Sequence, residues 1–357
     1  MSLKNRPWTW MLIMTMQSIW LLASTMHAKQ IVIAHRGASG YLPAHTLPDK
    51  AMAVAQGADY IEQDLVMSKD NVLYVCHDLR LDTTTNVAQM FPGRNRSDGY
   101  YYGIDFKWAE IALLSKTSSF HLNQAGKMVP NFPMSLVPVS GIDIFTPGGD
   151  TVGFVFQVQS KLTLNMLKKY NYTSRNDKIF LQCFDSNELK RIRKTLLKQN
   201  GMDLPLVQLM PIQVPPSANL TPSDIAQYAQ GIGPNKFQIV LPTSTKENLQ
   251  ITQLVTLAHA ANLVVHPWTF RQDQLPSYVT SFQQLLHIFY EIAQVDGMFT
   301  DFPDKAVKFL AQKNSSMSST TATVTTTSSG TRVSYPSYHS TALFIPLVLC
   351  LMVFSWS

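Results

Sequence analysis

Cysteine and charge are both scarce in this chain. It has three cysteines among 357 residues, and one of them, Cys350, lies in the C-terminal tail. The count excludes a disulfide framework, so we expect Cys76 and Cys183, which lie in apolar runs, to be buried free thiols. Charged residues make up 15% of the chain, and the net charge of +6 is dispersed. Because no basic patch is present, we expect no nucleic-acid partner.

Long apolar runs are also absent, since none reaches the roughly 20 residues of a membrane span. A shorter run, Trp8–Leu22, follows Lys4 and Arg6 and is itself followed by small residues. This pattern predicts a secretory signal peptide over residues 1–28, with an uncleaved signal anchor as the alternative.

The C-terminal end changes composition twice. Residues 314–341 are rich in Ser and Thr and contain the small residues Ser328, Ser329 and Gly330, whereas residues 342–357 form an apolar tail. Small residues, a polar spacer and a short apolar tail are typical of a GPI-attachment signal. A tail-anchored span is the alternative, although no Lys or Arg follows the tail. We therefore expect a protein of the secretory pathway, held at the cell-surface membrane by a lipid anchor.

Secretion would give meaning to the Asn-X-Ser/Thr sequons of the chain, because such sites accept glycans on surface loops of secreted proteins. Three of them are candidate acceptors, at Asn95, Asn171 and Asn314. A fourth, at Asn219, is weaker because Pro222 follows it closely.

Between the two ends, over residues 29–313, short apolar runs alternate with stretches of helical periodicity. The predicted strands are Ile31–Ala34, Tyr60–Val66, Val72–Cys76, Gly153–Val158, Lys178–Gln182, Leu206–Met210, Gln230–Gly233, Leu263–Val265 and Gly297–Thr300. The predicted helices are Leu47–Gln56, Leu162–Tyr170, Ser186–Lys198, Leu249–Ala260 and Thr280–Ala293. Such an alternation over about 250 residues favours an α/β fold, a TIM-type (β/α)8 barrel.

Nine predicted strands are one more than such a barrel needs. Val66 and Val72 are too close in sequence for a parallel crossover, so their two strands should form an antiparallel β-hairpin after strand 2. The return strand then lies outside the barrel, which leaves eight. Residues 79–151 form a long insertion before the fourth barrel segment, and its aromatic side chains would line a pocket or form a small satellite core.

The hairpin also gathers polar residues. With a turn centred between Lys69 and Asp70, His77 would lie opposite Glu62, and Asp64 would share the face of Glu62. A slip of one residue would move His77 to the other face. Two neighbouring carboxylates in an apolar strand would repel each other and need a cation or a proton. If a cation is bound, the oxygen ligands suit a divalent ion such as Mg²⁺ or Ca²⁺.

His35 and Arg36 end the first predicted strand, at the position where barrel enzymes place catalytic groups. An arginine can hold a phosphate with two hydrogen bonds, and a histidine can transfer protons near neutral pH. Taken alone, the pair could equally be a structural ion pair. With His77 as a second histidine beside one metal ion, the set suits acid–base chemistry in a displacement at phosphorus.

These residues stand in segments that resemble the glycerophosphodiester phosphodiesterase family, and most closely its bacterial periplasmic branch. The segments that carry the resemblance are His35–Gly40, Gly57–Asp64, His77-Asp78, Leu181–Asp185, Val265–Trp268 and Thr300–Lys305. They are spread over both halves of residues 29–313.

The resemblance implies a barrel enzyme that hydrolyses small-molecule glycerophosphodiesters to sn-glycerol 3-phosphate and an alcohol. It implies that His35 and His77 are the catalytic acid–base pair and that Arg36 binds the phosphate. It also implies that Glu62 and Asp64 are ligands of the divalent cation.

The chain departs from the family pattern at three positions. Ala44 stands where the family usually has Glu, and Gln157 and Gln159 stand at the Glu and Lys of a Glu-X-Lys motif. By the resemblance, Gln157 would be a weak third metal ligand, because its oxygen is neutral. The missing lysine removes a positive charge that would stabilise the transition state.

These departures leave more than one function open. The first hypothesis is a surface phosphodiesterase, fully active or reduced in activity. The second is a catalytically impaired relative that binds a ligand or partner at the cell surface. A third, a lipid-directed relative such as a lysophospholipase D or a sphingomyelinase D-like enzyme, is disfavoured by the likeness to the periplasmic branch.

Overall fold

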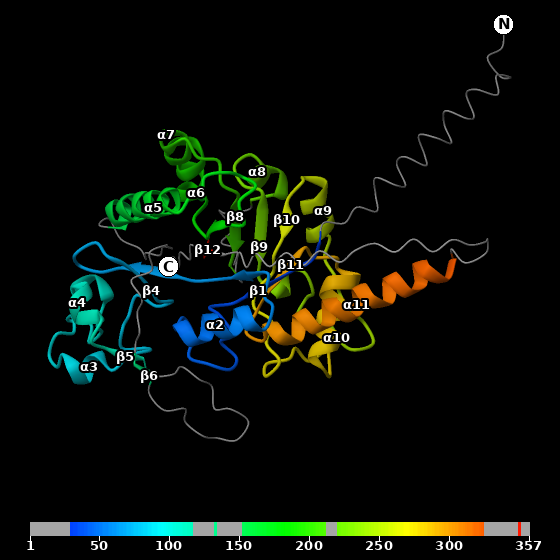
Figure 1. Cartoon of the computed structure of the whole chain (residues 1–357), viewed down its shortest axis with the longest axis horizontal. Coiled ribbons are helices and arrows are strands. Elements are labelled where there is room, and N and C mark those ends of the chain that lie inside the picture. Colours follow the sequence, from blue (N-terminus) through cyan, green and yellow to red (C-terminus); the bar gives the residue numbers. More distant parts are fainter. Residues whose placement is uncertain (1–28, 117–131, 134–151, 212–219, 325–348, 351–357) are drawn as a thin grey trace, which may run out of the picture. The chain divides into compact units, whose positions relative to one another are not determined.

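The computed structural model describes residues 29–116, 132–133, 152–211, 220–324 and 349–350 (Figure 1). Its described part is an α/β fold in which parallel strands alternate with helices, as the sequence predicts. The predicted signal peptide, residues 1–28, lies outside the described residues, as does most of the C-terminal stalk and tail.

The parallel strands fall into two sheets. One has the order β11-β1-β2 and consists of β1 (Ile31–Ala34), β2 (Tyr60–Ile61) and β11 (Gly297–Thr300). The other has the order β10-β9-β8-β7-β12 and consists of β7 (Leu181–Cys183), β8 (Leu206–Met210), β9 (Gly231–Pro234), β10 (Val264–Val265) and β12 (Leu349–Cys350). A parallel bridge between Phe270 and Thr300 brings the chain beyond β10 against β11 and so connects the two sheets. The strand order is therefore that of a TIM-type barrel.

One predicted barrel strand is wrong. Gly153–Val158 does not form a strand but belongs to α5 (Val152–Lys169), which also contains most of the predicted helix Leu162–Tyr170. A short apolar run does not distinguish a buried strand from a helix, and no Gly or Pro separates this run from the helix that follows. Beside β7, the neighbouring strand is instead β12. Among the described residues, no pairing closes the barrel between β12 and β2.

The helices follow the barrel strands and cover the largest apolar core. They are α2 (Leu47–Ala55), α5, α6 (Ser186–Arg191), the π-helical η2 (Ile192–Leu196), α7 (Leu197–Asn200), α8 (Pro222–Ala226), α9 (Leu254–Ala260), α10 (Phe282–His287), the π-helical η4 (Ile288–Ile292) and α11 (Pro303–Val324), with a 3₁₀ turn η3 (Lys236–Gln238). Local signals set several ends: Thr46 caps α2 by accepting from the Asp49 N–H, and Gly201 ends α7 with a φ of 65°. The boundary predicted at residue 313 lies within α11.

The hairpin after strand 2 is present as β3 (Leu65–Met67) and β4 (Leu73–Val75). The insertion beyond it contains α3 (Val87–Met90), a 3₁₀ turn η1 (Gly103–Asp105), α4 (Trp108–Ile111), β5 (Ser115–Lys116) and β6 (Phe132–Pro133). Its buried aromatics, Tyr101 and Phe106, pack with Tyr74 and Cys76 in a separate cluster, so they form the predicted satellite core.

Cys76 and Cys183 are both buried free thiols, as predicted. Within the described part of the chain, no helix is both long enough and apolar enough for a membrane crossing.

Candidate active site

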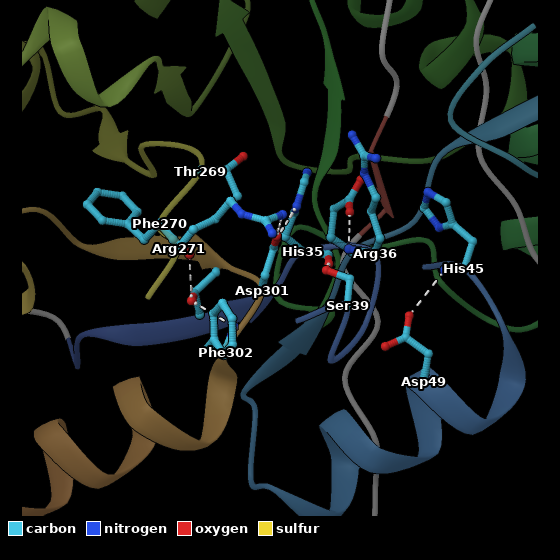
Figure 2. Close-up of polar contacts among 12 residues, drawn as sticks. His35, Arg36, Ser39, His45, Asp49, Thr269, Phe270, Arg271, Asp301 and Phe302 are labelled. Atoms are coloured by element: carbon cyan, nitrogen blue, oxygen red, sulfur yellow. Dashed lines mark hydrogen bonds and ion pairs between the residues drawn. The ribbon is translucent and has the colours of Figure 1, made fainter. Parts of the chain in front are cut away.

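The pairing of β1 with β11 places His35 beside Asp301. The two strands are in the register Ala34 to Thr300, so the residues that follow them stand at the same edge of the sheet. His35 Nδ1 lies 2.7 Å from Asp301 Oδ1, and both side chains are buried (Figure 2). Burial, followed by the charge of Arg36, lowers the pKa of His35, against the opposing effect of Asp301. The ring is therefore neutral at neutral pH, with its Nδ1 hydrogen directed at the carboxylate acceptor.

Arg36 turns the chain sharply after β1, with a φ of 64° in the left-handed region. Its N–H donates to Glu62 Oε2 at 2.5 Å, and its carbonyl oxygen accepts from the His45 N–H at 3.1 Å. Gly37 follows with a φ of 119°, and a Cβ there would lie 2.3 Å from a carboxylate oxygen of Asp49. The turn is therefore held by partners from α2, from the loop before it and from the segment after β2, which together stabilise an otherwise unfavourable conformation.

Glu62 and Asp64 lie between β2 and β3, and both are fully buried. Arg36 Nε lies 3.7 Å from Asp64 Oδ2. Burial raises the pKa of the Glu62 carboxyl, and burial together with the Glu62 charge raises the pKa of Asp64 to about 7. The charges of His77, Arg36 and His35 lower the Asp64 pKa in that order. The predicted acid–base, phosphate-binding and carboxylate residues therefore meet around Asp64.

The register of the hairpin differs from the predicted one by one residue. Leu65 pairs with Val75, which centres the turn on Asp70 rather than between Lys69 and Asp70. Asn71 adopts a φ of 60° and adds a third residue to the loop. A type I turn followed by a left-handed residue is the common three-residue hairpin, and the sequence-based prediction assumed an even-numbered loop instead.

The prediction that His77 lies directly opposite Glu62 is therefore wrong, although the His77 charge still acts on Asp64. His77 Nδ1 lies 2.6 Å from Asp78 Oδ1, and the Thr83 hydroxyl donates to Asp78 Oδ2 at 2.7 Å. Burial lowers the pKa of His77. Although burial acts the other way on its partner, the hydrogen bond and charge of His77 lower the pKa of Asp78 to about 2. Both histidines thus have Nδ1 engaged by a carboxylate, which makes Nε2 the nitrogen for proton transfer.

The structure gives no support to Gln157 as a metal ligand. The residue lies within α5 rather than at the end of a barrel strand, and its side chain lies outside the described side chains. Gln159 is buried on the same helix, and the next residue, Ser160, donates a hydrogen bond to Glu188 of α6. The helix thus packs against α6, and the strand end on which the prediction rested is not present.

The structure adds three residues that sequence reasoning missed. His45 Nε2 lies 2.9 Å from Asp64 Oδ2. Asp301 contacts His35, and the Arg271 guanidinium donates to the second oxygen of Asp301 (Figure 2). Asp301 could have been found from its place directly after the last predicted strand, because polar groups at such ends form the sites of barrel enzymes. His45 and Arg271 carry no comparable signal, since both lie in loops.

The buried carboxylates fit a hard divalent cation. Glu62 Oε1 and Asp64 Oδ1 are buried, and the described residues offer neither oxygen a hydrogen-bond partner. Within the described residues, no three His, Cys, Asp or Glu side chains are grouped closely enough to hold a metal ion by themselves. A divalent ion such as Mg²⁺ commonly takes one or two carboxylates and completes its shell with water and substrate phosphate. Glu62 and Asp64 would then be its protein ligands.

Comparison with known proteins places these residues in a family. The sequence profile of the Glycerophosphoryl diester phosphodiesterase family matches residues 35–305, a span that begins at His35 and includes every residue of the site. The chain belongs to this family. Membership makes the chain an enzyme, a phosphoric diester hydrolase, and confirms the family predicted from the motifs.

Two bacterial members of the family are similar to this chain over most of its length. A glycerophosphodiester phosphodiesterase of Haemophilus influenzae is 38% identical over 335 residues, which cover 80% of this chain and 91% of the relative. One of Treponema pallidum is 32% identical over 332 residues, covering 80% of this chain and 93% of the relative. The likeness therefore extends well beyond the site.

Solved structures support the barrel fold. A crystal structure of a protein from Silicibacter pomeroyi, described as a putative glycerophosphoryl diester phosphodiesterase, has a TM-score of 0.57 at 21% identity. The match covers 81% of this chain and 95% of that protein. An Oleispira antarctica phosphodiesterase in complex with the product sn-glycerol-3-phosphate has a TM-score of 0.53 at 18% identity, with coverages of 79% and 96%. These neighbours have the TIM-barrel fold, which is the fold class of this chain.

Proposed function

We propose that the chain hydrolyses glycerophosphodiesters to sn-glycerol 3-phosphate and an alcohol, with a divalent cation held by Glu62 and Asp64. The observation that carries the proposal is the meeting of two histidines, Arg36 and the two buried carboxylates around one point. The names of the bacterial relatives and the product bound in the Oleispira antarctica structure support the substrate class.

We assign a part of the reaction to each of these side chains. Arg36 binds the phosphate through its guanidinium, which suits a bidentate anion. Both histidines are oriented through Nδ1 and act through Nε2. One of them is neutral and takes a proton from the attacking water, while the other is protonated at Nε2 and gives that proton to the leaving alcohol. When bound, a divalent cation supplies positive charge to the phosphoryl oxygens.

The test is hydrolysis of glycerophosphocholine by the purified chain with Mg²⁺ or Ca²⁺, measured as release of glycerol 3-phosphate. We expect release that depends on the divalent ion and falls at least about 10²-fold in His35→Ala and in His77→Ala. An exposed histidine on α10, His287, provides the control, and His287→Gln should keep the wild-type rate. Persistence of activity in His35→Ala would contradict the acid–base assignment.

A second candidate function is supported by the helical structure of residues 153–158, which were predicted to be a barrel strand. Because residues 152–158 lie in α5, the described structure offers no third carboxylate beside Glu62 and Asp64. A catalytically impaired relative that binds a ligand at the cell surface would show no release of glycerol 3-phosphate at high enzyme concentration. It would still bind glycerophosphocholine in a calorimetric titration. Because residue 157 lies in α5, Gln157→Glu should not restore the release of glycerol 3-phosphate, and restoration would contradict the placement of this residue in a helix.

We further propose that the protein acts at the outer cell surface, bound by a GPI anchor. The support lies in the sequence patterns at residues 1–28 and 314–357. Asn95, Asn171 and Asn314 are all exposed, as glycan acceptors must be. Release of the protein from intact cells by a phosphatidylinositol-specific phospholipase C tests the anchor. Retention after that treatment would favour a signal anchor or a tail-anchored span.

A further inference from the structure

Three buried or half-buried polar side chains, Arg271, Asp301 and His35, form a hydrogen-bonded row. The Arg271 guanidinium donates to Asp301 Oδ2, and Asp301 Oδ1 lies 2.7 Å from His35 Nδ1 (Figure 2). Asp301 is 2% exposed, so its carboxylate depends on protein partners rather than water. Both of its oxygens are thus engaged, one by the histidine and one by the arginine.

The backbone fixes the positions of all three residues. Phe270, which precedes Arg271, donates its N–H to the Phe299 carbonyl at 2.8 Å and forms a parallel bridge with Thr300. The Asp301 N–H donates to the Phe270 carbonyl at 3.3 Å. The loop after β10 and the end of β11 are therefore tied together at the point where the two side chains meet.

Charge also favours this arrangement. Although burial alone would raise it, the charge and hydrogen bond of His35 and the charge of Arg271 hold the pKa of Asp301 below its usual value. Arg271 is itself oriented by Asp273, which accepts from Nε at 3.1 Å and from a terminal nitrogen at 2.7 Å. An ionised Asp301 can only accept, so the hydrogen between it and the ring is on His35 Nδ1.

We propose that Asp301 and Arg271 are positioning residues for His35. Asp301 holds the ring in the Nδ1–H tautomer, so that Nε2 faces the phosphodiester, and Arg271 holds Asp301 in the orientation that this requires. The inference rests on the proposed function of His35 in proton transfer. It goes beyond that function because neither residue is among those proposed to bind the phosphate or to transfer a proton.

The two histidines differ in the carboxylate that orients them. Its counterpart, His77, is oriented by the next residue in the chain, Asp78, whose side chain is 34% exposed. His35 instead depends on a residue from the opposite end of the barrel sequence, buried and paired with an arginine. The alternative is a purely structural role, in which Asp301 and Arg271 only connect β11 to the loop after β10. Their removal would then affect the stability of the protein and not the tautomer of His35.

The experiment combines ¹⁵N-histidine NMR of the full chain with steady-state kinetics on glycerophosphocholine. In the wild type we expect the Nδ1–H tautomer at His35. Asp301→Asn should change the tautomer balance, because an amide can also donate to Nδ1, and should lower kcat about 10²- to 10⁴-fold with KM changed less than about threefold. Arg271→Lys should retain more of the wild-type tautomer balance and of kcat than Arg271→Gln. Lysine keeps the positive charge beside Asp301, although it lacks the planar guanidinium, whereas glutamine has no charge.

Asp304→Asn is the matched control, since Asp304 lies in the same segment and accepts from the Tyr41 hydroxyl at 2.7 Å. It should leave the His35 signals and kcat unchanged. An unchanged tautomer in Asp301→Asn overturns the proposal, and so does a changed tautomer with an unchanged kcat. If the wild type itself is inactive, the proposed function fails, whereas the tautomer still decides the positioning role. Should Asp301→Asn not fold, the two Arg271 variants, made at a half-buried side chain, decide the question by the same readouts.

Discussion

The backbone N–H of Arg36 donates to Glu62 Oε2 at 2.5 Å while Arg36 holds a left-handed φ of 64°. One carboxylate thus stabilises the turn that presents the phosphate-binding arginine and also offers a second oxygen, Oε1, to a cation. The structure couples these two tasks in a single side chain, and substitutions at Glu62 can separate them.

Glu62→Gln should reduce metal affinity while preserving the turn. The amide oxygen can still accept from the Arg36 N–H, but the negative charge that attracts a divalent ion is lost. We expect at least about tenfold weaker Mg²⁺ or Ca²⁺ binding by calorimetry and a fall in kcat/KM of about 10²-fold or more. Chelation of the metal should lower wild-type activity in the same way.

Glu62→Ala is the comparison that isolates the turn. It removes the acceptor as well as the charge, so it should also lower the free energy of unfolding by about 1–3 kcal/mol, which Glu62→Gln should not do. Equal metal affinity in wild type and both variants would contradict the assignment of Glu62 as a ligand.

Gly37→Ala should destabilise the fold and reduce activity. Its φ of 119° is unfavourable for any other residue, and the added Cβ would lie 2.3 Å from an Asp49 carboxylate oxygen. We expect a loss of about 3 kcal/mol or more in the free energy of unfolding, measured by urea denaturation.

Gly93→Ala is the control for the cost of placing a residue with a Cβ at a positive φ. Gly93 also has a positive φ, of 76°, but a Cβ there would meet nothing within 4 Å. This variant should lose only about 1–2 kcal/mol. If both variants lost equal stability, the close approach of Asp49 would not be the reason for glycine at position 37.

The sequence predicts most of the barrel because buried parallel strands are continuous apolar runs. Ile31–Ala34, Leu206–Met210 and Gly297–Thr300 are strands with the predicted bounds. Gly153–Val158 is the exception, since its composition suits a buried helix equally well. Periodicity cannot separate those two states in a run of six residues.

The site was predictable where its residues are close in sequence. His35-Arg36 and Glu62 with Asp64 lie at strand ends that any barrel would bring together. The partnership of His35 with Asp301 joins residues 266 positions apart and depends on the exact register of β1 against β11. The position of His77 depended on the loop length at Asn71, which the residue types alone did not decide.

His266 should make the protein less stable in mild acid. Burial lowers the pKa of this fully buried histidine from 6.5 to about 4. As pH falls below 6.5, the unfolded chain binds the proton and the folded chain does not, so unfolding becomes more favourable until pH 4 is passed. Above pH 6.5 the histidine is neutral in both states and costs no stability. Between pH 6.5 and pH 4 the free energy of unfolding should fall by about 3 kcal/mol in total because of this group.

Urea denaturation at several pH values between 7 and 4 measures this loss. In His266→Leu the dependence of unfolding free energy on pH should be shallower over that window, because the titrating group is gone. The exposed-histidine variant His287→Gln should keep the wild-type slope. A wild-type slope in His266→Leu would show that other groups cause the acid sensitivity.

Tyr74→Phe should stabilise the satellite core. Tyr74 is fully buried, and the described residues give its hydroxyl no hydrogen-bond partner. Gly103 packs so closely that a Cβ there would lie 1.8 Å from the Tyr74 hydroxyl oxygen. A buried hydroxyl without a partner costs about 1–3 kcal/mol relative to an apolar group. We therefore expect the urea midpoint to rise, with the m-value unchanged.

Tyr228→Phe is the matched comparison, because the same atom is removed from another buried tyrosine. The Tyr228 hydroxyl donates to Gln208 Oε1 at 2.8 Å, so its loss should lower the free energy of unfolding by about 1 kcal/mol. The two variants should thus shift the midpoint in opposite directions. A loss of stability in Tyr74→Phe equal to that in Tyr228→Phe would mean that the Tyr74 hydroxyl is hydrogen-bonded in solution.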